Sequence, residues 1–139
     1  MSTVRLLGAV DLPGSPSSIA VARAYVRKLP GVAGHPRANE VELLVSELVT
    51  NAVQHSDSGR RPQGMLRLVV ADHDHTLHVE VIDEGSSGAI PQVPTQVDSL
   101  SENGRGLWPV QELSSAWGWK ESETGRVVWF DLPTRPQQP

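Results

Sequence analysis

Residues 37–55 read RANEVELLVSELVTNAVQH, and this stretch decides the fold. Its apolar side chains recur at the spacing of a single helical face: Val41, Leu44, Val45, Leu48 and Ala52. The polar run Ser56-Asp57-Ser58-Gly59 follows and ends the pattern. The sequence therefore predicts a long amphipathic helix with one buried face.

The segment before this helix predicts a strand and a shorter helix. Residues 3–12 alternate imperfectly and stop at Pro13-Gly14, which is typical of an edge strand closed by a turn. Apolar residues then recur at helical spacing from Ile19 to Leu29, before Pro30-Gly31. Three serines stand where they could cap this helix: Ser15, Ser17 and Ser18.

The segment after the long helix predicts two hairpins separated by a loop and a helix. Residues 65–72 and 77–83 are expected to pair around the turn at His73-Asp74-His75. The later expected elements are a lid-like loop over 84–103, a helix over 106–115 that begins near Pro109, and strands over 117–120 and 126–132. We expect Trp117, Trp119 and Trp129 to close the core of the sheet.

This order of elements predicts an α+β fold. We expect a two-layer sandwich whose helices pack on one face of a mixed, mainly antiparallel sheet. The length of 139 residues suits one core, so we expect a single domain over 1–133 and a disordered tail over 134–139.

Composition narrows the classes of function. The net charge is -4 and no cluster of Lys and Arg is present, which argues against direct binding to nucleic acid. The chain has no cysteine, so it has no disulfide or cysteine-based zinc site, as is usual in a reducing compartment. Arg5 interrupts the only apolar stretch near the start, and no run suits a membrane span. We expect a cytoplasmic location without membrane attachment.

Glu47 and Asn51 lie four residues apart on the long helix, so they project from adjacent turns of one face. An amide oxygen is a suitable ligand for Mg²⁺, and a nearby carboxylate can act as a general base. Taken alone, this pattern is more often the solvated polar edge of a helix.

Asp83 directly follows a predicted strand and precedes Glu84-Gly85. Its carboxylate could accept a hydrogen bond from an exocyclic amine, and Gly85 would let a flat ring approach the backbone. The other interpretation is a simple Asp-Glu-Gly turn.

The segment Gly104-Arg105-Gly106-Leu107 precedes the helix that Pro109 marks, and it could offer free backbone N–H groups to a phosphate. It is neither a Walker A loop nor a dinucleotide fingerprint. The histidines His73, His75 and His78 fall in or beside a hairpin turn, where polar residues are expected without a metal.

Four segments considered together carry a family resemblance: SELVTNAVQHS, VIDEGSSGAIP, ENGRGLWPVQEL and GRVVWFDLP. In their order and spacing, the chain resembles the GHKL ATP-binding family of gyrases, histidine kinases and mismatch-repair ATPases. Within that family it looks most like the small anti-sigma-factor serine/threonine kinases. These kinases phosphorylate a serine on an anti-sigma-factor antagonist and release or capture a sigma factor accordingly.

The resemblance implies a role for each candidate residue, with ATP and Mg²⁺ as cofactors. Glu47 would be the general base and Asn51 would hold Mg²⁺. Asp83 would bind the adenine amine, and Gly85 would make room for the ring. The remaining nucleotide contacts would come from the first glycine box and the end of the lid: Gly88, Gly104, Arg105, Gly106 and Leu107.

Two positions depart from the family pattern. The glycine box has Ser87 at its fifth position, with Gly88 one residue later, and Val127 stands where a threonine usually supports the Asp–adenine contact through water. The resemblance therefore implies either a kinase acting on an antagonist or a module that senses ATP or ADP and holds a regulatory partner. A role as the ATP domain of a histidine-kinase-like assembly rests on fold analogy alone. A homodimer is compatible with all three.

Overall fold

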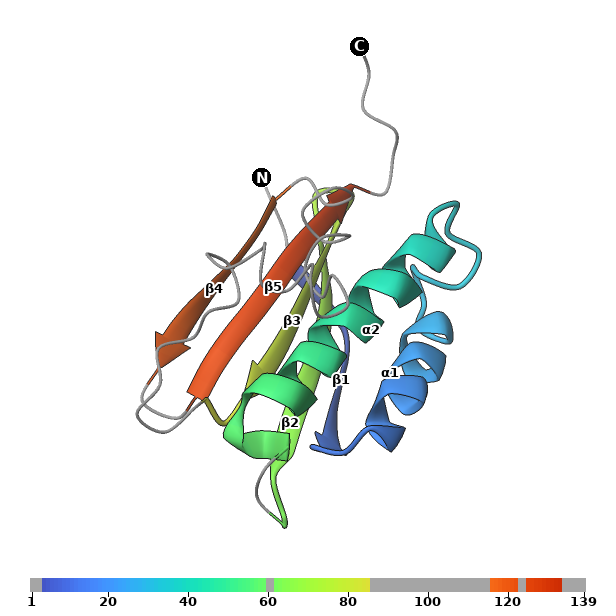
Figure 1. Ribbon diagram of the computed structural model, residues 1–139. Helices are drawn as coiled ribbons and strands as arrows, with labels where there is room; N and C mark the ends of the chain where they lie inside the picture. Colours follow the sequence, from blue (N-terminus) through green and yellow to red (C-terminus); the bar gives the residue numbers. More distant parts are fainter. Residues whose placement is uncertain (1–3, 60–61, 86–115, 123–124, 134–139) are drawn as a thin grey trace, which may run out of the picture.

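The structure is a computed structural model that describes residues 4–59, 62–85, 116–122 and 125–133. Two α-helices cover one face of a five-stranded sheet, which confirms the expected α+β fold (Figure 1). The elements are β1 (Val4–Pro13), α1 (Ser17–Arg27), α2 (Ala38–His55), the 3₁₀ turn η1 (Asp57–Gly59), β2 (Met65–His73), β3 (Thr76–Asp83), β4 (Ala116–Ser122) and β5 (Gly125–Pro133).

The strand order is β1-β2-β3-β5-β4, and every pairing among these described strands is antiparallel, whereas a mixed sheet was expected. Strand β1 lies at one edge, as expected. The β2–β3 hairpin turns at Asp74 and His75, whose φ values are 50° and 62°. Positive φ at both central residues gives the turn a twist that matches the flanking strands.

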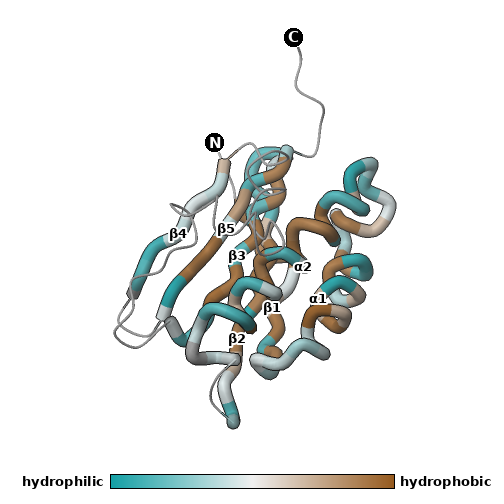
Figure 2. The backbone as a smooth tube through the Cα atoms, in the orientation of Figure 1, coloured by the Kyte–Doolittle hydropathy of each residue, from teal (hydrophilic) through white to brown (hydrophobic). Residues whose placement is uncertain are grey.

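The hydrophobic core lies between the helices and the sheet. The five apolar residues expected on one face of α2 are all at most 1% exposed. They meet alternate residues of the strands, which project from the helix-facing side of the sheet: Leu66, Leu68, Val70, Leu77, Val79, Val81, Val128, Phe130 and Leu132. Figure 2 shows these apolar stretches along α2 and the central strands.

One sequence prediction about this layer is wrong, and a second is wrong for one of its three residues. No serine side chain caps α1: Pro16 occupies the cap position, and the Ser18 hydroxyl donates to the Pro13 carbonyl oxygen at 2.6 Å. Trp129 pairs with Glu80 and so projects from the face opposite the helices, whereas Trp117 and Trp119 pack against the core. Trp129 pairs with Gly118, which lies between Trp117 and Trp119 on β4, so Trp129 points to the face opposite both of them.

Several expected segments lie outside the described residues. These are the lid-like loop from Ser86 onward, the helix over 106–115 and the tail over 134–139. Among the helices that are described, none is long and apolar enough to cross a membrane.

Candidate functional site

Asn51 lies near the C-terminal end of α2 and is 3% exposed. Neither its amide nitrogen nor its amide oxygen has a hydrogen-bond partner within the described part of the chain. A buried polar group without a partner is costly, so such a group is usually explained by a bound ion, water or ligand. The amide oxygen is a hard donor of the kind that Mg²⁺ prefers, so this position fits the metal that the sequence implied.

Glu47 lies one turn earlier on the same helix and is partly buried. Burial raises the pKa of its carboxyl group to about 7, because desolvation penalises the charged form. A carboxyl group with a pKa near the working pH is well matched to accept a proton during a reaction. Glu47 is therefore partly shielded from solvent and does not lie on a fully solvated edge of the helix.

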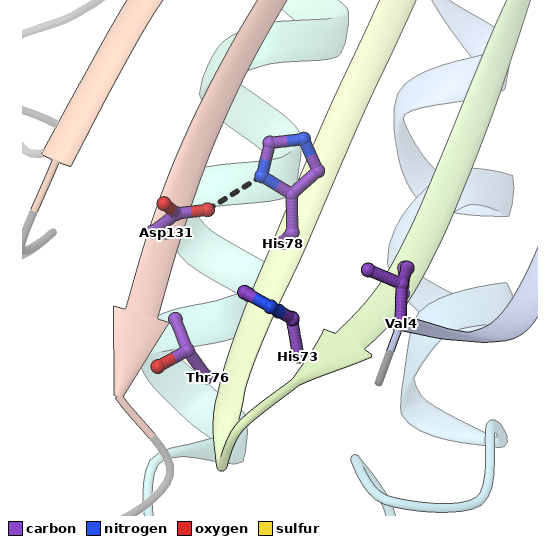
Figure 3. Close-up of a pocket in the computed structure, with 6 residues that line it drawn as sticks. Val4, His73, Thr76, His78 and Asp131 are labelled. Carbon is purple, nitrogen blue, oxygen red and sulfur yellow. Dashed lines mark hydrogen bonds and ion pairs between the residues drawn. The ribbon is translucent and has the colours of Figure 1, made fainter. Parts of the chain in front are cut away.

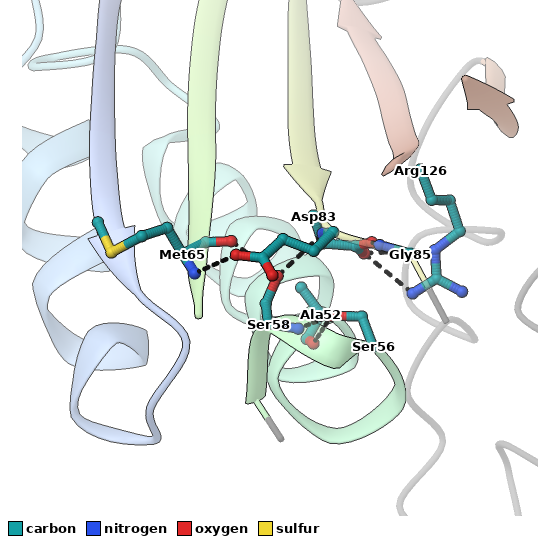
Figure 4. A network of polar contacts seen from close by, with 8 residues as sticks. Ala52, Ser56, Ser58, Met65, Asp83, Gly85 and Arg126 are labelled. Carbon is teal, nitrogen blue, oxygen red and sulfur yellow. Dashed lines mark hydrogen bonds and ion pairs between the residues drawn. The ribbon is translucent and has the colours of Figure 1, made fainter. Parts of the chain in front are cut away.

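Asp83 ends β3 on the helix-facing side of the sheet, and its carboxylate is held from two directions (Figure 4). The Gly85 backbone N–H donates to Oδ1 at 2.7 Å. Arg126 donates to Oδ2 through Nη2 at 3.0 Å and through Nε at 3.3 Å. The two charged side chains are 0% and 1% exposed, so this is a buried ion pair.

Arg126 is a site residue that the sequence did not reveal. It lies directly opposite Asp83 in the β3–β5 register, which brings together residues 43 positions apart. Neither the turn chemistry nor the alternation of each strand specifies which residues face one another. Only the register of β3 against β5 identifies Arg126, and that register depends on the pairing of strands distant in sequence.

The same register corrects the interpretation of Val127. Val127 pairs with Ile82 and projects from the face opposite Asp83, because neighbouring strand residues alternate between faces. Arg126, and not Val127, is the β5 residue beside the Asp83 carboxylate.

A chain of hydrogen bonds ties the Asp83–Gly85 turn to the end of α2 (Figure 4). The Ser56 hydroxyl donates to the Ala52 carbonyl oxygen at 2.6 Å and accepts from the Ser58 backbone N–H at 3.1 Å. The Ser58 hydroxyl accepts from the Glu84 N–H at 2.9 Å and donates to the Met65 carbonyl oxygen at 2.7 Å. The network therefore joins the last turn of α2, through the Ala52 carbonyl oxygen, to the backbone next to Asp83.

Replacing Ser58 by alanine should lower the free energy of unfolding by about 1–3 kcal/mol, because two backbone groups lose a buried partner. Urea denaturation measures the change. Ser17→Ala is the matched control, since Ser17 is exposed and should change stability by less than about 0.5 kcal/mol. Equal effects of the two substitutions would contradict a supporting role for Ser58.

Two glycines are required where the turn meets β5. Gly85 has φ of +74°, a left-handed conformation that favours glycine. A Cβ atom on Gly125 would lie 1.9 Å from the Asp83 carbonyl oxygen. The backbone of β5 therefore packs directly against the turn that carries Asp83.

Some site residues expected from the sequence lie outside the described residues. These are Ser87, Gly88, Gly104, Arg105, Gly106 and Leu107. The described part of the site therefore consists of the α2 pair (Glu47 and Asn51), the turn over residues 83–85, and Arg126.

A separate polar cluster lies on the opposite face of the sheet. His78 contacts Asp131 through Nδ1 at 2.5 Å and Glu80 through Nε2 at 2.9 Å. Burial acts to lower the pKa of His78, but the hydrogen bonds to Glu80 and Asp131 together outweigh it and raise the pKa. The cluster borders a hollow of about 240 Å³ (Figure 3). No group of three or more His, Cys, Asp or Glu residues in the described ranges could hold a metal ion.

One family of known proteins matches the part of the chain that contains all of these residues. The family model of the histidine kinase-like ATPase domain matches residues 12–132, which include every candidate residue above. No curated protein matches the chain.

Proposed function

The chain belongs to the histidine kinase-like ATPase domain family, an ATP-binding module, and on that premise we propose that it is a Mg·ATP-dependent protein serine/threonine kinase of the anti-sigma-factor type. Its substrate is a serine on an anti-sigma-factor antagonist, and its partners include that antagonist, a sigma factor, or both. The proposal places the protein in the cytoplasm.

The observation that carries the proposal is the state of the α2 pair. Glu47 has a pKa of about 7, and Asn51 in the next turn is buried with an unpartnered amide in the described part of the chain. A module that only holds a nucleotide has no need of a carboxyl group poised to accept a proton at neutral pH.

Each residue then has a defined task in the transfer. Glu47 accepts the proton of the substrate serine hydroxyl while the serine oxygen forms a bond to the γ-phosphorus of ATP. The bond between that phosphorus and the β,γ-bridging oxygen breaks at the same time, and ADP leaves. The Asn51 amide oxygen would hold Mg²⁺, which when bound offsets the negative charge of the phosphates. Asp83 positions the base of the nucleotide.

The second candidate function is a module that senses ATP or ADP and holds a regulatory partner without phosphotransfer. The irregular first glycine box favours it, because Ser87 stands at the fifth position where the family pattern has a glycine. The two functions differ in whether label moves from the nucleotide to a protein.

The test is incubation of the purified protein with γ-labelled ATP, Mg²⁺ and candidate antagonists of the same cell. Transfer of label to an antagonist serine supports the kinase. Retention of nucleotide in a stable complex with the partner, without any transfer, supports the binding module and contradicts the kinase.

The rate of transfer should depend on pH through Glu47. A general base must be unprotonated, so kcat/KM should rise with pH, reach half of its plateau near pH 7, and stay level above that. Rates measured at limiting substrate across this range give the profile. In Glu47→Gln any residual rate should lose this step, and a step that survives there would assign the titration to another group.

A further inference from the structure

The Asp83 carboxylate has little capacity left for another hydrogen bond. A carboxylate offers about four lone-pair positions. Three of them accept the N–H groups of Gly85 and Arg126, at 2.7, 3.0 and 3.3 Å. Both Arg126 contacts fall on Oδ2, so that oxygen is saturated. An incoming amine would have to displace a donor that is already in place.

The pair is also hard to open without a replacement. The side chains of Asp83 and Arg126 are 0% and 1% exposed, so water cannot substitute for a broken contact. A buried charge that loses its partner is strongly destabilising. Arg126 therefore competes directly with any ligand that seeks the carboxylate.

The chemistry at position 6 of a purine distinguishes the two side chains. An amino group there donates, so a carboxylate accepts it and a guanidinium does not. An oxo group accepts, so a guanidinium N–H donates to it and a carboxylate repels it. At position 6 a carboxylate alone favours the amino group of ATP, whereas a carboxylate held beside a guanidinium can satisfy either an amino or an oxo group.

We propose that Arg126 is a specificity-determining residue of the base site. It competes with the 6-amino group of ATP for Asp83 and supplies a donor to the 6-oxo group of ITP or GTP. The site with Arg126 then discriminates less between these purines than Asp83 alone would. This inference rests on the proposed ATP-binding role of Asp83.

Calorimetry with Mg·ATP and Mg·ITP, on the full chain and on Arg126→Met, tests the proposal. ITP is the sharper probe because it replaces the 6-amino group of ATP by an oxo group, with a proton on N1, without adding the 2-amino group of GTP. The ratio of ATP affinity to ITP affinity should rise about tenfold or more in Arg126→Met, the effect of roughly one hydrogen bond to a charged group. An unchanged or smaller ratio would overturn the proposal.

Two further variants keep the test decisive. Arg126→Lys retains the charge with fewer donors and should give an intermediate ratio; if Arg126→Met does not fold, an unchanged ratio in Arg126→Lys overturns the proposal. Adding Arg126→Met to Asp83→Asn should raise the ratio by less than Arg126→Met alone, because only the contact to the 6-oxo group is then lost; an equal rise would contradict competition for Asp83. If the unaltered chain binds neither nucleotide, the proposed function fails and this inference with it. If the chain binds ATP but the ratio does not respond, only the inference fails.

Discussion

Replacing Glu47 by glutamine should lower the rate of phosphotransfer by about 10²–10⁴ while ATP affinity stays within a few-fold of the unaltered chain. Glutamine keeps the size and polarity of the side chain but cannot accept the serine proton. Because the pKa of the Glu47 carboxyl group is about 7, a large fraction of it is unprotonated at neutral pH and can accept the proton. Single-turnover transfer from labelled ATP gives the rate, and calorimetry gives the affinity.

Two other substitutions on α2 make this result specific. Glu40→Gln is the matched control: Glu40 is ion-paired with Arg37 at 2.8 Å in the first turn, and its loss should leave the transfer rate unchanged. Asn51→Ala should instead weaken Mg·ATP binding itself, because a metal ligand acts in the ground state as well as the transition state. A Glu47→Gln protein that transfers phosphate at the original rate would remove Glu47 from the role of base.

Replacing Asp83 by alanine should lower the free energy of unfolding by about 3–5 kcal/mol, because it leaves a charged guanidinium buried without its partner. Arg126 is 1% exposed, so solvent cannot reach it to compensate. Urea denaturation at neutral pH measures the loss. The same variant should also lose the acceptor for the base of ATP, so its nucleotide binding is interpretable only where the chain remains folded.

Controls separate the buried pair from an ordinary ion pair. Asp11 contacts Arg67 at 2.7 Å, but both side chains are more than half exposed, so Asp11→Ala should leave the denaturation midpoint nearly unchanged. Adding Arg126→Met to Asp83→Ala should restore part of the lost stability, since no charge then remains buried. If Asp83→Ala is no more destabilising than Asp11→Ala, the buried pair does not form in solution.

The candidate site was only partly accessible from the sequence. Glu47, Asn51 and Asp83 could be selected because their residue types and spacing are local properties of one helix and one strand end. The raised pKa of Glu47 and the unpartnered amide of Asn51 could not be predicted from the sequence, because both depend on what covers the helix. The sequence pattern places Val127 at the Asp–adenine contact, and the β3–β5 register instead places Arg126 beside Asp83.

The sequence by itself determined the elements of the described fold, since hydrophobic periodicity is a property of neighbouring residues. It identified the buried face of α2 from Val41 to Ala52 and the β2–β3 hairpin. Only the tertiary structure decided that Arg126 would face Asp83 and that Trp129 would lie beside His78, at a ring separation of 5.5 Å on the opposite face. The physical reason is that β5 pairs with β3 across more than forty residues, and a shift of one residue in that pairing would exchange the two faces.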